Sequence, residues 1–121
     1  MIEILESFPD DVVAFCAKGR VTRRDYDHVL APKVREAFSR HKAVRCYYEL
    51  GAAFSGMEAG AAWEDFKVAF GHYFGWTRVA VVTDTKWIRR AMTAFQFLVP
   101  GEMRVFGTQQ VDKARKWIVA T

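Results

Sequence analysis

The chain has 121 residues, of which 51% are hydrophobic and 26% are charged. This length holds one domain but not two separate cores, and the composition excludes a disordered or collagen-like chain. Lys and Arg outnumber Asp and Glu by 18 to 14, a formal net charge of +4, but the basic residues are scattered, so we expect no nucleic-acid partner. No uncharged stretch is long enough to span a bilayer, and the first residues lack the basic start of a signal peptide. We therefore expect a cytoplasmic protein.

The first half of the chain predicts two strands, a helix and a third strand. Residues 1–5 and 12–17 are short β-rich runs joined by a turn signal. Thr22 and Asp25 have the spacing of a helix-capping box, and apolar residues then recur at helical intervals. Pro32 interrupts this helical pattern and predicts a kink, or a helix start that is delayed to that point.

The third strand is predicted over residues 44–50, where apolar and polar residues alternate. Residues 51–56 follow as a loop of small side chains. Apolar residues over 59–74 then share one face of a second helix. The continuous apolar run 79–82 is typical of a parallel strand that is covered on both faces.

The remainder predicts two more helices around a final strand. Asp84 or Thr85 caps the third helix, whose inward positions are predicted to be Trp87, Ile88, Ala91, Met92 and Phe95. Residues 103–106 form the last strand. Thr108 caps the last helix, whose apolar positions are Val111, Ala114, Trp117 and Ile118.

Strands that alternate with helices favour a mainly parallel sheet. We therefore predict a single α/β domain over residues 1–121, with a four- to five-stranded, mainly parallel sheet, an antiparallel N-terminal strand, and helices packed on the sheet.

Known catalytic motifs are incomplete in this sequence. Gly51 and Gly56 have the glycine spacing of a phosphate-binding P-loop, but Met57 and Glu58 stand where Lys and Ser or Thr are required. Ser55 lacks the flanking glycines of a nucleophile elbow. We expect no enzyme, although one that uses Glu58 or Glu64 is a third, weaker alternative.

The two cysteines and three histidines have no partners at metal-ligand spacing. Cys16 and Cys46 fall in strand-like runs and are predicted to be buried, unpaired thiols. We expect neither a metal nor a cofactor.

Two features favour a binding role. The segment 49–60 is rich in small residues and follows a predicted parallel strand, where ligands and partners usually bind. Aromatic residues also crowd the second half of the chain, where they form a filled core, an apolar pocket or an exposed patch. The candidate partner- or ligand-binding residues are Phe54, Ser55, Gly56, Met57, Glu58, Trp63, Phe66 and Trp87.

Six stretches of this sequence carry a family resemblance: Phe8-Pro-Asp-Asp-Val-Val, Gly19-Arg-Val-Thr, Tyr48-Glu-Leu-Gly, Gly60-Ala-Ala-Trp-Glu-Asp, Ala80-Val-Val-Thr-Asp and Pro100-Gly-Glu-Met-Arg-Val-Phe. With the element order, they make the chain resemble the STAS/SEC14-like small bacterial proteins of the stage II sporulation protein AA-like (SpoIIAA-like) family. The resemblance covers nearly the whole chain and implies a four- or five-stranded sheet backed by helices.

This resemblance implies a non-enzymatic regulatory or protein-interaction module. Anti-sigma-factor antagonists of this type carry a phosphorylated serine at the start of the second helix, but here residues 56–60 contain no serine or threonine and Glu58 falls at or beside that position. The Sec14 (CRAL-TRIO) relatives imply the alternative, a small carrier of an apolar, lipid-like ligand. The partner therefore stays open between an unidentified protein, a second copy in a homodimer, and a small apolar ligand.

Overall fold

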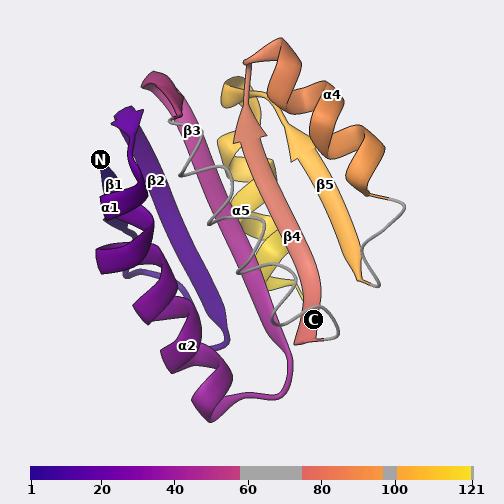
Figure 1. Ribbon diagram of the computed structural model, residues 1–121. Helices are drawn as coiled ribbons and strands as arrows, with labels where there is room; N and C mark the ends of the chain where they lie inside the picture. The colour runs from indigo at the N-terminus through magenta and orange to yellow at the C-terminus, as the bar shows by residue number, and fades with distance from the viewer. Residues whose placement is uncertain (58–74, 97–100, 121) are drawn as a thin grey trace.

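The strands form one mixed sheet in the order β1-β2-β3-β4-β5 (Figure 1). The computed structural model describes residues 1–57, 75–96 and 101–120, and the side chains within this part except those of residues 52–57 and 95. Strand β1 is antiparallel to β2, and the other neighbouring strands are parallel. This arrangement confirms the predicted fold class. The strands are β1 (Ile2–Ile4), β2 (Val12–Val21), β3 (Val44–Met57), β4 (Trp76–Thr83) and β5 (Glu102–Phe106).

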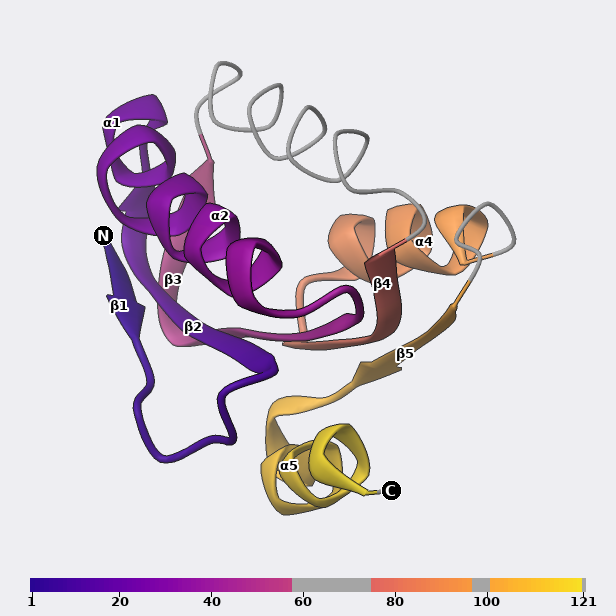
Figure 2. The ribbon, with the colours of Figure 1, turned by 90° about the horizontal axis from the view of Figure 1, so that it is seen from below.

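The described helices cover both faces of the sheet (Figure 2). Helices α1, α2 and α4 lie on one face, and α5 lies on the other. The helix predicted over residues 59–74 falls outside the described residues. No helix within the described ranges combines the length and apolar composition needed to cross a membrane. The helical segments are α1 (Arg23–Asp25), a π-helical turn (Tyr26–Leu30), α2 (Ala31–Arg40), α4 (Lys86–Phe95), a 3-10 turn (Thr108–Gln110) and α5 (Val111–Val119).

The first six residues of β2, Val12–Ala17, are all apolar because both faces of the strand are buried there. Val13 and Phe15 point into the core beneath α2, whereas Val12 and Ala14 point into the core beneath α5. Successive side chains of a strand face opposite sides of the sheet, so both sets are buried only because helices cover both faces. The buried residue Ile118 of α5 completes the second core.

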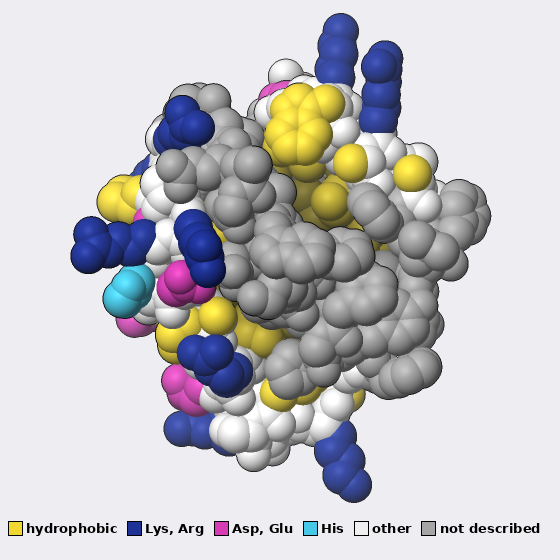
Figure 3. All heavy atoms as spheres, viewed as in Figure 1, with side chains coloured by type: hydrophobic (Ala, Val, Ile, Leu, Met, Phe, Trp, Pro, Cys, Tyr) yellow, Lys and Arg dark blue, Asp and Glu magenta, His cyan; other side chains and the backbone are white. Residues whose placement is uncertain are grey.

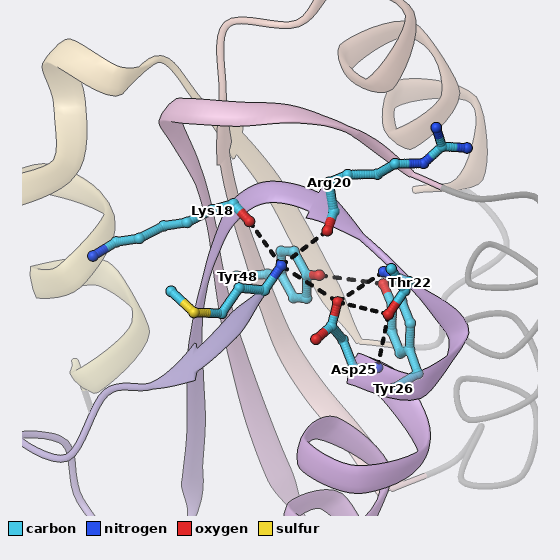
Figure 4. A network of polar contacts seen from close by, with 7 residues as sticks. Lys18, Arg20, Thr22, Asp25, Tyr26 and Tyr48 are labelled. Carbon is cyan, nitrogen blue, oxygen red and sulfur yellow. Dashed lines mark hydrogen bonds and ion pairs between the residues drawn. The ribbon is translucent and has the colours of Figure 1, made fainter.

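The first helical segment begins with the predicted capping box (Figure 4). The Asp25 carboxylate accepts hydrogen bonds from the backbone N–H of Thr22 at 2.8 Å and from its hydroxyl at 3.0 Å. In return, the Asp25 N–H donates to the Thr22 hydroxyl at 3.3 Å. These bonds satisfy backbone donors that the first turn of a helix leaves without partners.

The charge on Asp25 is expected to make stability depend on pH. Burial raises the pKa of Asp25, but its hydrogen bonds from Thr22 and the nearby α-amino group of Met1 outweigh burial, and the pKa lies below its ordinary value of 3.8. The unfolded state therefore binds a proton more readily, so this contribution is present above pH 3.8 and is lost as the pH falls through the lower, folded-state pKa.

An Asp25→Asn variant keeps an oxygen acceptor for the cap but removes the charge. We expect its free energy of unfolding, measured by urea titration, to fall less steeply than that of the original chain as the pH drops below 3.8. Parallel pH dependences of the two proteins would contradict the prediction. Titrations at pH 7 give the baseline difference between them.

Pro32 produces an irregular turn rather than a delayed helix start. Helical residues begin at Arg23, so the predicted delay is wrong. The irregularity is the π-helical turn Tyr26–Leu30, in which the N–H of Ala31 donates to the carbonyl of Tyr26, five residues earlier. In a regular α-helix the ring of Pro32 would collide with the carbonyl four residues before it, and the wider turn relieves that collision.

The small-residue stretch 51–56 belongs to β3, so the predicted loop is wrong. Between the register pairs Ala17–Leu50 and Val21–Met57, β2 advances by four residues and β3 by seven, so the pairing contains bulges. Gly19 of β2 has a φ of +59°, a conformation that favours glycine. Small residues in this stretch resemble a loop, but pairing with the distant strand β2 makes it a strand.

Two arginines hold the C-terminal end of α5 against the sheet. Arg45 of β3 donates to the carbonyls of Ile118 at 2.9 Å and Ala120 at 2.6 Å. Arg78 of β4 donates to the carbonyls of Trp117 at 2.9 Å and Ala120 at 2.7 Å. Carbonyls at the end of a helix lack partners within the helix and carry partial negative charge, so guanidinium donors suit them.

Candidate functional site

The carboxyl ends of the parallel strands meet at one edge of the sheet, the usual binding edge of such folds. After β4, Asp84 accepts hydrogen bonds from the backbone N–H of Thr108 at 3.0 Å and from its hydroxyl. These bonds lower the pKa of the Asp84 carboxyl. They also join the β4–α4 connection to the connection that follows β5.

Thr108 therefore has a different role from the predicted one. Gly107, not Thr108, occupies the N-cap position of the 3-10 turn that leads into α5. The Thr108 hydroxyl is directed to Asp84 instead. Thr108 was predicted as a cap because Ser and Thr are common caps, and its partner 24 residues away is not visible from local spacing.

Helix α4 leaves a tryptophan on its solvent side. Trp87 is 59% exposed, whereas the next residue, Ile88, is 4% exposed. The predicted inward position of Trp87 is therefore wrong. Residues one apart lie about 100° apart around a helix, and the core-facing positions are Ile88 and, one turn later, the partly buried Met92.

Two cationic side chains lie on the same side of α4 as Trp87. Lys86 and Arg90 are both exposed, and they are one helical turn apart. Arg89 is directed elsewhere, since its guanidinium donates to the carbonyl of Thr83 at 3.0 Å. We call Lys86, Trp87 and Arg90 the outer α4 face.

Among the predicted site residues, Trp87 has a described side chain. The backbone of residues 54–57 forms the end of β3, paired with Gly19–Val21 of β2. This places residues 54–57 and the start of α4 at the same edge of the sheet (Figure 1). Outside the described residues lie Glu58, Trp63 and Phe66, as well as the side chains of Phe54, Ser55 and Met57.

A cluster of polar side chains lies on the α5 face of the sheet, around Glu49. The buried hydroxyl of Tyr47 donates to Glu49 Oε1 at 2.6 Å, and the thiol of Cys16 lies 3.5 Å from Glu49 Oε2. Arg115 of α5 reaches both Tyr47 Oη and Glu49 Oε1 at 3.5 Å. Phe8 stacks on the Tyr47 ring with centroids 5.1 Å apart.

The electrostatics of this cluster favour a structural role. Burial, followed by the hydrogen bond to Glu49, raises the pKa of Tyr47. Burial, followed by the charge of Glu49, also raises the pKa of the Cys16 thiol. A nucleophile or base needs a lowered or near-neutral pKa, so these shifts oppose reactivity. The cluster links α5 to β2 and β3.

The cysteines lie on opposite faces of the sheet and are not joined by a disulfide. Cys16 is buried as predicted, whereas Cys46 is only partly buried. Within residues 1–57, 75–96 and 101–120, the structure brings together no group of His, Cys, Asp and Glu side chains that could hold a metal ion.

The alternation of residues 44–50 predicted a strand that contains Glu49, but it gave no sign of the cluster around that residue. Tyr47 and Glu49 were seen as alternate positions of β3 facing away from Tyr48 and Leu50. The missing information was that α5 covers that face as well, which buries Tyr47 completely. The sequence contained one sign that a helix covers this face, namely the apolar stripe on the last helix.

Comparisons with known proteins agree with this architecture. The family model described as SpoIIAA-like matches residues 12–119. Among solved structures, the chain is similar to an uncharacterized protein from the DUF3478 family with a SpoIIAA-like fold, from Shewanella loihica PV-4. That likeness has 26% sequence identity and a TM-score of 0.77, and it covers 98% of this chain and 92% of the other. No curated protein matches. Since the family model spans most of the sequence and its fold is the one found here, the chain belongs to the SpoIIAA-like family.

Proposed function

We propose that this chain is a non-enzymatic protein-interaction module that uses the carboxyl edge of its sheet as the contact face. The exposed indole of Trp87 is the observation that carries the proposal, since at 59% it is the most exposed large hydrophobic side chain in the described part of the chain. Trp is among the residues most enriched at the energetic centres of protein interfaces. Its position at the start of α4 agrees with the usual binding edge of parallel sheets.

The polar cluster around Glu49 supports a role without catalysis. Tyr47 and Cys16 are hydrogen-bonded to Glu49 itself, and the pKa of each is raised. Tyr47 and Glu49 therefore hold Arg115 of α5 against the sheet, and Cys16 joins the same cluster from β2. The proposed contact face also includes residues 54–58 of the β3 end and its continuation, while Trp63 and Phe66 remain predicted contacts.

Replacing Trp87 with Ala should weaken partner binding while leaving the fold intact. We expect at least about a tenfold loss of affinity, because interface tryptophans commonly contribute 2 kcal/mol or more. The tagged chain and its variant are expressed in native cells and co-purifying proteins are quantified by mass spectrometry. The main partner is then purified and titrated calorimetrically.

Val119→Ala is the matched control, because Val119 is also exposed, at 39%, but lies on α5 on the opposite face. Equal binding by the original chain and Trp87→Ala would contradict the proposed contact face. Native mass spectrometry of the same samples tests the alternative carrier function. A retained apolar ligand, with no co-purifying protein, would favour the carrier function over the protein-interaction module.

A further inference from the structure

We propose that the outer α4 face binds an acidic segment of a protein partner, with Trp87 packing against an apolar side chain of that segment. This inference rests on the proposed function and specifies the chemistry of the partner. Lys86 and Arg90 are exposed beside Trp87, and α4 contains no acidic residue. Figure 3 shows hydrophobic side chains over this helix and Lys and Arg side chains that project from it into solvent.

Lys86 and Arg90 can reach a partner, whereas Arg89 is already hydrogen-bonded within the chain. Arg89 is directed to the carbonyl of Thr83 at 3.0 Å, whereas no ion pair is found for Lys86 or Arg90 within the described residues. The nearest acid along the chain, Asp84, is occupied by both hydrogen-bond donors of Thr108. Among the described residues, the outer α4 face therefore presents positive charge without an acidic partner, around an exposed indole.

A protein segment fits this face better than a membrane or a nucleic acid. Ile88 and Met92 on the other side of α4 pack on the sheet. Among the described side chains of this helix, Trp87 is then the one large apolar group left exposed, which is too little for an apolar stripe that enters a bilayer. Two cations are also few for the phosphate contacts on which nucleic-acid affinity depends. Carboxylates suit both side chains, and Arg90 can bind one with two parallel hydrogen bonds.

Selection from a random 12-residue peptide library displayed on phage tests this inference. We expect the enriched peptides to carry several Asp or Glu residues and at least one large apolar residue. Their affinity, measured by fluorescence anisotropy, should fall about tenfold or more in the Lys86→Glu/Arg90→Glu variant and in Trp87→Ala. It should also fall as the salt concentration rises, because exposed charges are screened.

The charge-matched control is Lys113→Glu/Lys116→Glu, which makes the same change in net charge at two exposed positions of α5. Equal loss of binding in the two double variants would show a general charge effect and overturn the inference. Enriched peptides without acidic residues that still require Trp87 would overturn it while leaving the proposed function intact. If no peptide is enriched, or if phosphatidylglycerol vesicles bind in a Lys86- and Arg90-dependent manner instead, the assignment to an acidic protein segment is wrong.

Discussion

Replacing Gly101 with Ala is expected to destabilise the fold by about 3 kcal/mol, the upper part of the usual range for overpacking. A Cβ atom at this position would lie 2.5 Å from the carbonyl oxygen of Thr77, 2.6 Å from that of Trp76 and 2.7 Å from the carbonyl carbon of Thr77. These neighbours are backbone atoms of β4, so they cannot move aside as a flexible side chain does. Either β5 shifts away from β4, or the pairing between Arg78 and Glu102 is strained.

Urea unfolding monitored by circular dichroism measures this loss. Gly51→Ala is the matched control, because a Cβ at Gly51 meets nothing within 4 Å and the residue does not have a positive φ. We expect that control to change the free energy of unfolding by less than about 1 kcal/mol, with a small gain because Ala restricts the unfolded chain. Similar stabilities for the two variants would show that the start of β5 is less tightly packed than the structure indicates.

The second large effect is expected from Glu49→Ala. This change removes the acceptor of the completely buried Tyr47 hydroxyl and one partner of Arg115. The buried hydroxyl can then no longer donate its hydrogen to an acceptor and loses its hydration without compensation, so we expect destabilisation of about 2–3 kcal/mol. Glu49→Gln keeps an oxygen acceptor and should cost less.

A double-mutant cycle separates this hydrogen bond from general effects of the substitution. Tyr47→Phe removes the donor, so Glu49→Ala should cost clearly less in that background than in the original chain. The control is Glu36→Ala, because Glu36 forms an exposed ion pair with Arg40 at 3.6 Å and such pairs contribute about 0–1 kcal/mol. Additive effects of the Tyr47 and Glu49 substitutions would contradict a coupled network.

The local patterns in the sequence predicted most of the fold. Periodicity located the described strands and the helices near their true positions, and the Thr22–Asp25 spacing predicted the capping box. These features depend on residues that are near one another in the chain. The extension of β3 through residues 51–57 was missed because its cause is pairing with residues 19–21 of β2, more than thirty residues earlier.

The candidate site was less predictable, because exposure depends on how an element packs. An amphipathic pattern identified α4, but a rotation of about 100° decides whether Trp87 or Ile88 meets the core. The cluster around Glu49 likewise depends on Arg115, 66 residues later, which only the folded chain brings near. The predicted family was confirmed, and so was the fold that the family resemblance implies.

Arg45 and Arg78, which hold the C-terminal end of α5 against the sheet, also bear on the order in which the chain folds. The two residues are directly opposite each other in the register of β3 and β4, and together they receive the last carbonyls of α5. Their guanidinium groups are adjacent only after these strands have paired. The donors for the last carbonyls of α5 therefore come together only when β3 and β4 pair, and we expect the end of this helix to dock on the sheet after the two central strands have aligned.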